Sequence, residues 1–259
     1  MNFRRLIARS ISEMVAGVSW MREPVGGLRV LMYHAIGSPA LGDALGLFSL
    51  TPERFRRHMT TLANRAPESI CQLDKAALGT NEARIVITFD DGYLDNLEVA
   101  APILSELGLP FTVFVTSEFV RKGKAGFLCP VTLRMLAAVP GARIGAHGAT
   151  HVALTQCDDQ TLSNELNSSK HYLEDVIGCE VRTLAYPYGA ANRRVRDAAE
   201  AAGYQLGACS QAGINQPERD PLLLARTEIV SYDDVRVFSQ KLHGDWDWYR
   251  WRRQDPSCL

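Results

Sequence analysis

Short hydrophobic runs alternate along this chain with longer segments in which hydrophobic residues recur every three or four positions. The short runs are rich in β-branched and aromatic residues, which favour strands, whereas the longer period is typical of amphipathic helices. The predicted strands cover residues 28–33, 84–89, 111–116, 142–146, 181–186, 205–209 and 222–229. This alternation predicts about seven consecutive βα units and therefore a sheet of parallel strands.

The residues at the ends of the predicted helices support the same order. Thr51 is expected to cap a helix that has Pro52 at its first position. Gly108 and Gly178 each follow a helical stretch, and glycine readily adopts the left-handed conformation that ends a helix. The later helices are expected at residues 96–107, 132–139, 159–177 and 192–202.

Two arrangements of a parallel sheet are compatible with this pattern. A spacing of roughly 25 to 35 residues between strands suits a closed barrel, where chemical groups gather at the carboxyl ends of the strands. An open, doubly wound sheet would gather the same groups at its edge. The chain has 259 residues, 46% of them hydrophobic, which suffices for a substantial core, and we expect a single α/β domain.

The charge balance and the cysteines limit the classes of partner and the cellular compartments that the chain suits. Lysine plus arginine total 28 against 29 acidic residues, so no overall positive charge draws the chain to nucleic acid. The six cysteines include no Cys-x-x-Cys pair, which indicates free thiols in a reducing compartment. Because Glu13 interrupts the first hydrophobic stretch and no run reaches the length of a membrane span, we expect a cytoplasmic protein without a secretory signal.

Two segments at predicted strand ends carry the candidate chemistry. Asp90 and Asp91 follow the run that ends at residue 89, and two buried neighbouring carboxylates are costly unless a cation or a proton lies between them. His147 and His151 follow the strand at 142–146. Two imidazoles and one carboxylate leave a position open on zinc or a similar divalent ion, which is the pattern of catalytic metal sites.

An ordinary structural explanation competes with this metal site. Histidine pairs with this spacing arise by chance, and Asp and Gly are common in turns because of their local hydrogen bonds and backbone freedom. The combination at two strand ends is much less common, so a metal site is favoured over satisfied turn residues. The second aspartate would then be free to act as a general base toward a water molecule.

Three segments, in this order and spacing, resemble the polysaccharide deacetylases, also called carbohydrate esterase family 4 or the nodulation deacetylase homology domain. They are Thr-Phe-Asp-Asp-Gly-Tyr at 88–93, Ala-His-Gly-Ala-Thr-His-Val-Ala-Leu at 146–154 and Ala-Tyr-Pro-Tyr-Gly at 185–189. The likeness spans residues 28–247, with an amphipathic extension at 1–27 and an aromatic, basic tail at 248–259. It implies a distorted (β/α)7 barrel that removes N-acetyl groups from amino sugars and releases acetate.

The resemblance also implies roles for individual residues. Asp90 would be the catalytic base, and Asp91, His147 and His151 would bind the divalent ion, for which zinc is expected. The backbone N–H of Tyr188 would join the metal in stabilising the oxyanion. The residues expected to line the substrate cleft are His34, Tyr93, Tyr186 and Pro187.

The chain departs from the family pattern at two catalytic positions. Many relatives have an arginine that tethers the base where this chain has Ala185. Arg226, in the last predicted strand, is the candidate to replace it, and a plain surface ion pair is the alternative. His243, in a Leu-x-His context, is the candidate general acid, and an ordinary surface histidine is the alternative. His58 and His171 are expected on the surface.

The two ends of the chain allow two interpretations. A hydrophobic helical stripe with Arg4, Arg5 and Arg9 near the start, and the Trp and Arg residues near the end, suit a membrane–water interface. Packing against the outer wall of the barrel or against a partner subunit is the alternative. Membrane contact would make a lipid-linked saccharide at the inner face a natural substrate.

The leading hypothesis is a metal-dependent N-deacetylase that acts on an amino-sugar unit of a glycan, oligosaccharide or saccharide precursor, as in exopolysaccharide biosynthesis. One alternative is a deformylase that acts on a sugar formamide. The other is a carbohydrate-binding barrel without turnover, which Ala185 motivates and the intact acids and histidines argue against.

Overall fold

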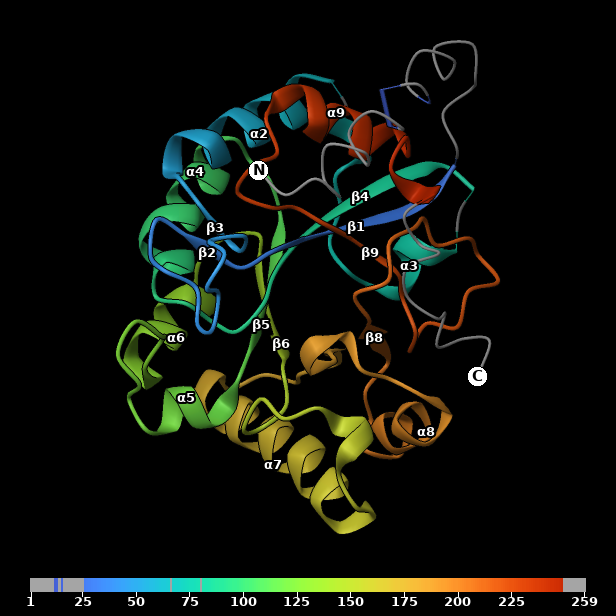
Figure 1. The fold of residues 1–259 in the computed structure, drawn as a ribbon. Helices are drawn as coiled ribbons and strands as arrows, with labels where there is room; N and C mark the ends of the chain where they lie inside the picture. The colour runs from blue at the N-terminus through green and yellow to red at the C-terminus, as the bar shows by residue number, and fades with distance from the viewer. Residues whose placement is uncertain (1–11, 14, 16–25, 66, 80, 249–259) are drawn as a thin grey trace.

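Seven parallel strands surround the centre of the molecule in the computed structural model, which describes residues 12, 13, 15, 26–65, 67–79 and 81–248 (Figure 1). Their order around the sheet is β8-β7-β6-β5-β4-β1-β9. The strands are β1 (Gly27–Tyr33), β4 (Ala83–Phe89), β5 (Phe111–Val115), β6 (Ala142–Ala146), β7 (Thr183–Ala185), β8 (Leu206–Ala208) and β9 (Arg226–Glu228). All neighbours in this sheet are parallel, so their carboxyl ends meet at one edge.

The sheet forms a nearly closed barrel. The last strand, β9, pairs with the first strand, β1, and β8 at the other edge reaches the segment before β9 through a bridge between Ala208 and Leu224. A doubly wound sheet would instead reverse its strand order near the middle. The distorted seven-stranded barrel is therefore confirmed, and the open-sheet alternative is wrong.

Helices cover the outside of this barrel (Figure 1). The α-helices are α2 (Pro52–Arg65), α3 (Lys75–Leu78), α4 (Ala101–Glu106), α5 (Ser117–Arg121), α6 (Pro130–Ala137), α7 (Asp159–Ile177), α8 (Arg193–Ala201) and α9 (Val235–His243). The shorter elements are the paired strands β2 (Ala35–Ile36) and β3 (Ser49–Leu50), the 3-10 turns η1 (Pro67–Ser69), η3 (Leu154–Gln156) and η4 (Pro187–Gly189), and the π-helix η2 (Asn96–Ala100). Helix α7 has the predicted bounds, and Gly178 ends it with φ 72°.

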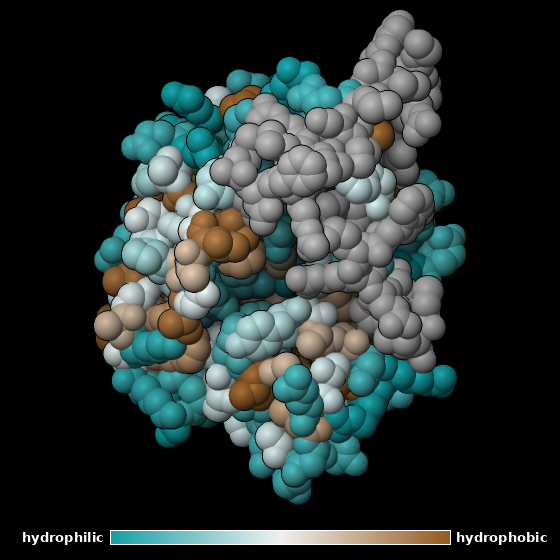
Figure 2. Space-filling view, viewed as in Figure 1, coloured by the Kyte–Doolittle hydropathy of each residue, from teal (hydrophilic) through white to brown (hydrophobic). Residues whose placement is uncertain are grey.

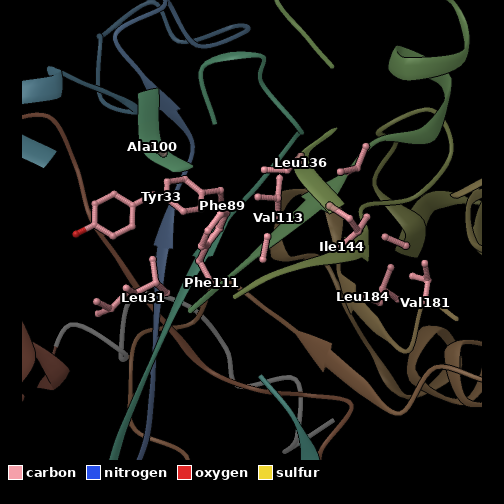
Figure 3. Packing of buried hydrophobic residues seen from close by; sticks show 14 of the residues in the cluster. Leu31, Tyr33, Phe89, Ala100, Phe111, Val113, Leu136, Ile144, Val181 and Leu184 are labelled. Carbon is pink, nitrogen blue, oxygen red and sulfur yellow. The ribbon is translucent and has the colours of Figure 1, made fainter. Parts of the chain in front are cut away.

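Alternate residues of the strands face two hydrophobic clusters. On β1, Leu31 and Tyr33 belong to the cluster that packs against the helices, which Figure 3 shows from close by. Leu28 and Val30 belong to a second cluster, made mainly of strand residues and closed by α3. This period of two is what a strand buried on both faces requires. The barrel interior is therefore filled by side chains, as it is in other small parallel barrels.

The segment predicted as one helix at 96–107 is divided into the π-helix η2 and the α-helix α4. Within η2, the buried side chain of Asn96 donates to the carbonyl of His34 at 2.9 Å, which ties this turn to the end of β1. π-Helical turns frequently occur at functional sites.

The expectation that His58 lies on the surface is wrong. His58 is fully buried, and its ring stacks on Phe238 with 4.3 Å between centroids and 5° between planes. Its Nε2 donates to the carbonyl of Asp233 at 2.9 Å. Phe238 belongs to α9, which packs against α2 and covers His58. The helical period around His58 could not predict this contact with a distant helix. His171 is exposed, as expected.

Most of the residues on which the membrane interpretation depends lie outside the described ones. Trp248 Nε1 donates to Ser12 Oγ at 3.0 Å, and Trp246 Nε1 donates to Gln240 Oε1 at 3.2 Å. Glu13 forms an ion pair with Arg236 on α9. These contacts favour packing for this small part of the two ends.

The described surface shows no sign of a membrane-spanning element. None of the described helices combines the length and hydrophobicity that crossing a membrane requires. On the face seen in Figure 2, hydrophobic residues form small groups between hydrophilic ones.

Candidate metal centre and active site

The candidate residues lie at the carboxyl ends of three strands of the same sheet. Asp90 and Asp91 follow β4, His147 follows β6, and His34 follows β1. Because β1 and β4 run in register, Tyr33 opposite Phe89, the turns that follow them are adjacent. The backbone N–H of Asp90 donates to the carbonyl of Tyr33 at 2.9 Å and fixes where the acidic turn begins.

Three of these side chains converge on one point. Nε2 of His151 is 3.1 Å and Nε2 of His147 is 3.4 Å from Oδ1 of Asp91. The ligand atoms of all three residues lie within 4.8 Å of one another, and Asp91 and His147 are buried. Ligand atoms of a tetrahedral zinc ion, each about 2.1 Å from it, stand about 3.4 Å apart. The separations fit such an ion.

Hydrogen bonding supports the fit. Nδ1 of His147 is 2.8 Å from the carbonyl oxygen of Ala185, which can only accept, so Nδ1 carries a proton and Nε2 faces Asp91. Oδ1 of Asp91 is buried and has no partner with hydrogen-bond geometry in the described structure. When His147 is neutral, as a metal-binding imidazole is, the lone pair of Nε2 faces this carboxylate oxygen. That contact is repulsive unless a positive charge lies between them, so the residues present fit a divalent cation.

The electrostatics of the acidic turn favour two ionised carboxylates. Burial alone would raise the pKa of Asp91, but the neighbouring imidazoles of His147 and His151 outweigh it and hold this pKa well below its ordinary value. Burial would likewise raise the pKa of Asp90, and the Arg226 guanidinium outweighs it, so that this pKa is also lowered. Both acids are therefore negative at neutral pH.

Arg226 holds Asp90 through a bidentate contact. Its two terminal nitrogens are 2.6 and 2.7 Å from the two carboxylate oxygens, and Nε donates to the carbonyl of Cys209 at 2.7 Å. The two side chains are only 1% and 4% exposed. The arrangement is a buried pair joined by two charge-assisted hydrogen bonds, so the surface-pair alternative is wrong. Ala185 lacks a charged group, and β9 supplies one from across the barrel.

Backbone strain is concentrated at the same place. Within the described chain, the non-glycine residues with positive φ are Asp91 at 73°, His151 at 65° and Tyr188 at 60°. Such conformations are costly for residues with a side chain and persist where the surroundings hold them. The Tyr188 ring lies 4.7 Å from that of His151, and Tyr188 is 64% exposed, so it borders the candidate metal centre at the surface.

His34 faces the two acids from the end of β1. Its ring is partly buried and packs against Phe48, with 4.6 Å between centroids and 40° between the ring planes. Its charge would lower the pKa of both Asp90 and Asp91, which indicates proximity to each. Nδ1 of His34 is buried without a hydrogen-bond partner in the described structure. His34 therefore lies beside the acidic turn, and its place in a substrate cleft stays a prediction.

Three of the expected substrate contacts are structural instead. Tyr186 is fully buried and donates its hydroxyl to the carbonyl of Leu222 at 2.8 Å, and Pro187 is buried below the histidine loop. Tyr93 is 2% exposed, and its hydroxyl accepts from the backbone of Leu41 at 2.6 Å. All three are buried and leave almost no surface for a substrate. The Tyr93 hydroxyl nevertheless lies near Asp91, since burial and the charge of Asp91 together raise the pKa of Tyr93.

His243 lies at the wrong end of the barrel for a general acid. It is exposed at the end of α9, which runs back from the carboxyl edge. Asp247, four residues farther, pairs at 2.9 Å with Arg29 near the start of β1. From Arg29 to His34 a strand rises about 16 Å, at about 3.3 Å per residue. The expectation that His243 protonates the leaving group is therefore wrong.

One residue that contacts the loop between His147 and His151 belongs to none of the three sequence motifs, so the motifs could not predict it. Glu165 on α7 is 5% exposed and accepts hydrogen bonds from the loop between His147 and His151. An acid on the buried face of a predicted helix, among Leu162 and Leu166, is the sequence signal that could have found it.

Comparisons with known proteins agree with this site. The family model described as polysaccharide deacetylase matches residues 77–207, which are 131 of the 259 residues. YxkH of Bacillus subtilis (strain 168), whose name places it among these deacetylases, is 26% identical over 217 residues, 82% of this chain and 75% of that protein. The matched range of the family model includes all three motifs and ends before Arg226.

Solved structures are also similar. The Streptococcus pyogenes deacetylase PplD, solved in complex with acetate, has a TM-score of 0.74 and 25% identity, covering 84% of this chain and 99% of that chain. BA0330 of Bacillus anthracis has a TM-score of 0.74 and 24% identity, covering 84% of this chain and 69% of its own. Fold, motifs and site geometry agree: the chain belongs to the polysaccharide deacetylase family.

Proposed function

We propose that this protein is a metal-dependent hydrolase that removes N-acetyl groups from amino-sugar units of a glycan, oligosaccharide or saccharide precursor. One observation carries the proposal: the cluster of Asp91, His147 and His151 lies beside Asp90, which Arg226 holds in place. The acetate in the PplD complex supports the same chemistry for a relative.

Each residue has a distinct role in this proposal. A divalent cation, with zinc expected, held by Asp91, His147 and His151 would supply Lewis acidity that activates water and polarises the acetamide carbonyl. Asp90 accepts the proton of the attacking water at a carboxylate oxygen. The ion pair with Arg226 keeps the Asp90 carboxylate ionised and fixes its orientation. The backbone N–H of Tyr188 donates to the oxygen on which negative charge develops.

His34 replaces His243 as the proposed proton donor to the leaving amine. It lies at the carboxyl edge beside both acids, and its buried Nδ1 has no hydrogen-bond partner in the described structure. His243 lies at the opposite edge. An imidazole can hold a proton at one nitrogen and transfer it to an amine.

Two other functions stay open as alternatives. A sugar formamide deformylase would use the same residues, and the product, formate rather than acetate, distinguishes it. A carbohydrate-binding barrel without turnover has no need of a buried carboxylate that is ionised and oriented beside a cation site. The buried Arg226–Asp90 pair therefore favours an enzyme.

The deciding experiment measures metal content and product together. Purified protein is expected to hold about one zinc per chain and to release acetate from N-acetylglucosamine oligomers, and a chelator should abolish that release reversibly. Asp90→Asn should keep the zinc and lose the activity, whereas His171→Ala, on the exposed face of α7, should behave like the parent. Zinc-loaded protein that releases neither acetate nor formate from any amino sugar tested would favour the binding protein.

The proposed setting is the inner face of a membrane, on a lipid-linked saccharide in exopolysaccharide biosynthesis. Its support is the hydrophobic and basic pattern of residues 1–27 and the aromatic, basic pattern of the tail. The full chain should co-sediment with anionic liposomes, and replacing Arg4, Arg5 and Arg9 by Gln should weaken that binding. Equal sedimentation of parent and variant, or none with either, would contradict this setting.

A further inference from the structure

Glu165 contacts the loop that carries both histidines. Its Oε2 accepts from the backbone N–H groups of Ala149 and Thr150 at 2.8 and 2.9 Å, and its Oε1 accepts from the Thr150 hydroxyl at 2.6 Å. These residues lie between His147 and His151. The carboxylate therefore holds the backbone that connects the two proposed metal ligands.

The opposite side of the same loop is held by α5. Backbone N–H groups of Ser117 and Glu118 donate to the carbonyls of Gly148 and Ala149 at 3.3 and 2.9 Å. Together with Glu165, these contacts satisfy two backbone N–H groups and two carbonyls of this segment, as buried peptide groups require. The loop is thus bound between the start of α5 and the middle of α7.

Glu165 itself depends on this contact. It is 5% exposed, and no lysine or arginine among the described residues pairs with it. A buried carboxylate without a cation is costly unless hydrogen-bond donors surround it. The three donors of the loop surround this carboxylate, so the loop and the acid stabilise one another.

The contact is also close. At Gly148, with φ +68°, an added Cβ would lie 3.1 Å from Oε2 of Glu165. His151 has φ 65°, a conformation that a histidine adopts only where the surroundings hold it. Removing the acid would allow the loop to relax and would turn the His151 ring away from Asp91.

We propose that Glu165 is a positioning residue that fixes the His147–His151 loop and so sets the affinity of the metal centre for its divalent cation. This inference rests on the proposed function, because it takes Asp91, His147 and His151 to be the metal ligands. Groups that orient metal ligands typically contribute 10- to 100-fold to metal affinity.

Glu174 on the same helix provides a matched control. Its side chain is 23% exposed, accepts from the backbone N–H of Val181 at 2.9 Å and pairs with Lys170. It therefore also fastens a segment of backbone onto α7, but away from the metal centre. A purely structural role of Glu165 would predict the same behaviour from both variants.

The test compares zinc affinity by competition with a chromophoric chelator, together with the absorption spectrum of the cobalt-substituted protein. Glu165→Ala should bind zinc about 10- to 100-fold more weakly than the parent and change the cobalt spectrum. Glu165→Gln and Thr150→Val keep part of the hydrogen bonding and should show smaller losses of the same kind. Glu174→Ala should lose stability but keep the parent affinity and spectrum.

The outcomes separate the two proposals. Parent-like zinc affinity and cobalt spectrum in folded Glu165→Ala would overturn the inference, and if that variant does not fold, parent-like values in both Glu165→Gln and Thr150→Val would do so. A parent that binds zinc but releases no acetate would overturn the proposed function, and the zinc affinities of the variants would still decide the role of Glu165. A parent that binds no zinc would overturn both.

Discussion

The buried pair between Arg226 and Asp90 permits a quantitative prediction. The perturbation is a double-mutant cycle of Arg226→Met, which keeps the length of the side chain without its charge, and Asp90→Asn. Both contacts are short, 2.6 and 2.7 Å, and both side chains are nearly inaccessible to solvent. Each single variant leaves one buried polar group without its counter-charge.

The expected magnitude follows from that geometry. Two unit charges about 4 Å apart interact by about 4 kcal/mol at an effective dielectric constant near 20. Removing one partner of a buried pair lowers the free energy of unfolding by about 3–5 kcal/mol. In the double variant no buried charge is left uncompensated, so its loss should be smaller than the sum of the two single losses by about 2–3 kcal/mol.

Urea unfolding followed by circular dichroism, in the presence of a chelator, measures these differences without a contribution from metal binding. Arg56, which pairs with Glu106 at 2.8 Å on the surface with side chains 48% and 61% exposed, is the matched control. Arg56→Met should lower the free energy of unfolding by less than about 1 kcal/mol. Losses from Arg226→Met and Asp90→Asn that add to within about 0.5 kcal/mol would refute the reasoning.

Three further predictions concern metal, proton transfer and pH. Asp91→Asn should weaken zinc binding and abolish acetate release even in a folded protein, whereas retained affinity would show that Asp91 is not a ligand. His34→Ala should lower kcat strongly and His243→Ala should leave it unchanged. A strong loss of kcat in His243→Ala but not in His34→Ala would instead identify His243 as the general acid. Burial lowers the pKa of His58 from 6.5 to about 4, so the unfolded chain binds the proton more tightly. The free energy of unfolding should therefore fall by up to about 3 kcal/mol as the pH falls through this window, and His58→Gln should flatten that dependence in urea unfolding at several pH values.

The local pattern of the sequence was sufficient for the elements of the barrel. The strand at 84–89 and the helix at 159–177 were predicted nearly to the residue, because period, capping residues and glycines act within a few positions. The shorter strands β7 to β9 were predicted too long, because hydrophobic runs do not show where pairing with a neighbour stops. The π-helical turn at Asn96 was missed, since it depends on a side-chain contact with the end of β1.

The positions of individual side chains were harder to predict from the sequence. The motifs placed Tyr93, Tyr186 and Pro187 at the site, but a motif does not say which residues are buried. His58 and His243 were misplaced for the same kind of reason. The burial of His58 and the edge at which His243 lies are both decided by where α9 packs.

The sequence by itself determined the parallel βα order, the acidic turn after β4 and the paired histidines after β6, because each is encoded within a short segment. Only the tertiary structure decided that Asp91 meets both histidines and that Arg226, 136 positions from Asp90, replaces the arginine missing at Ala185. It also decided that Glu165 supports the histidine loop. The physical reason is that barrel closure brings β9 beside β1 and α7 against the loop after β6, and contacts between such distant segments leave no periodic trace in the sequence.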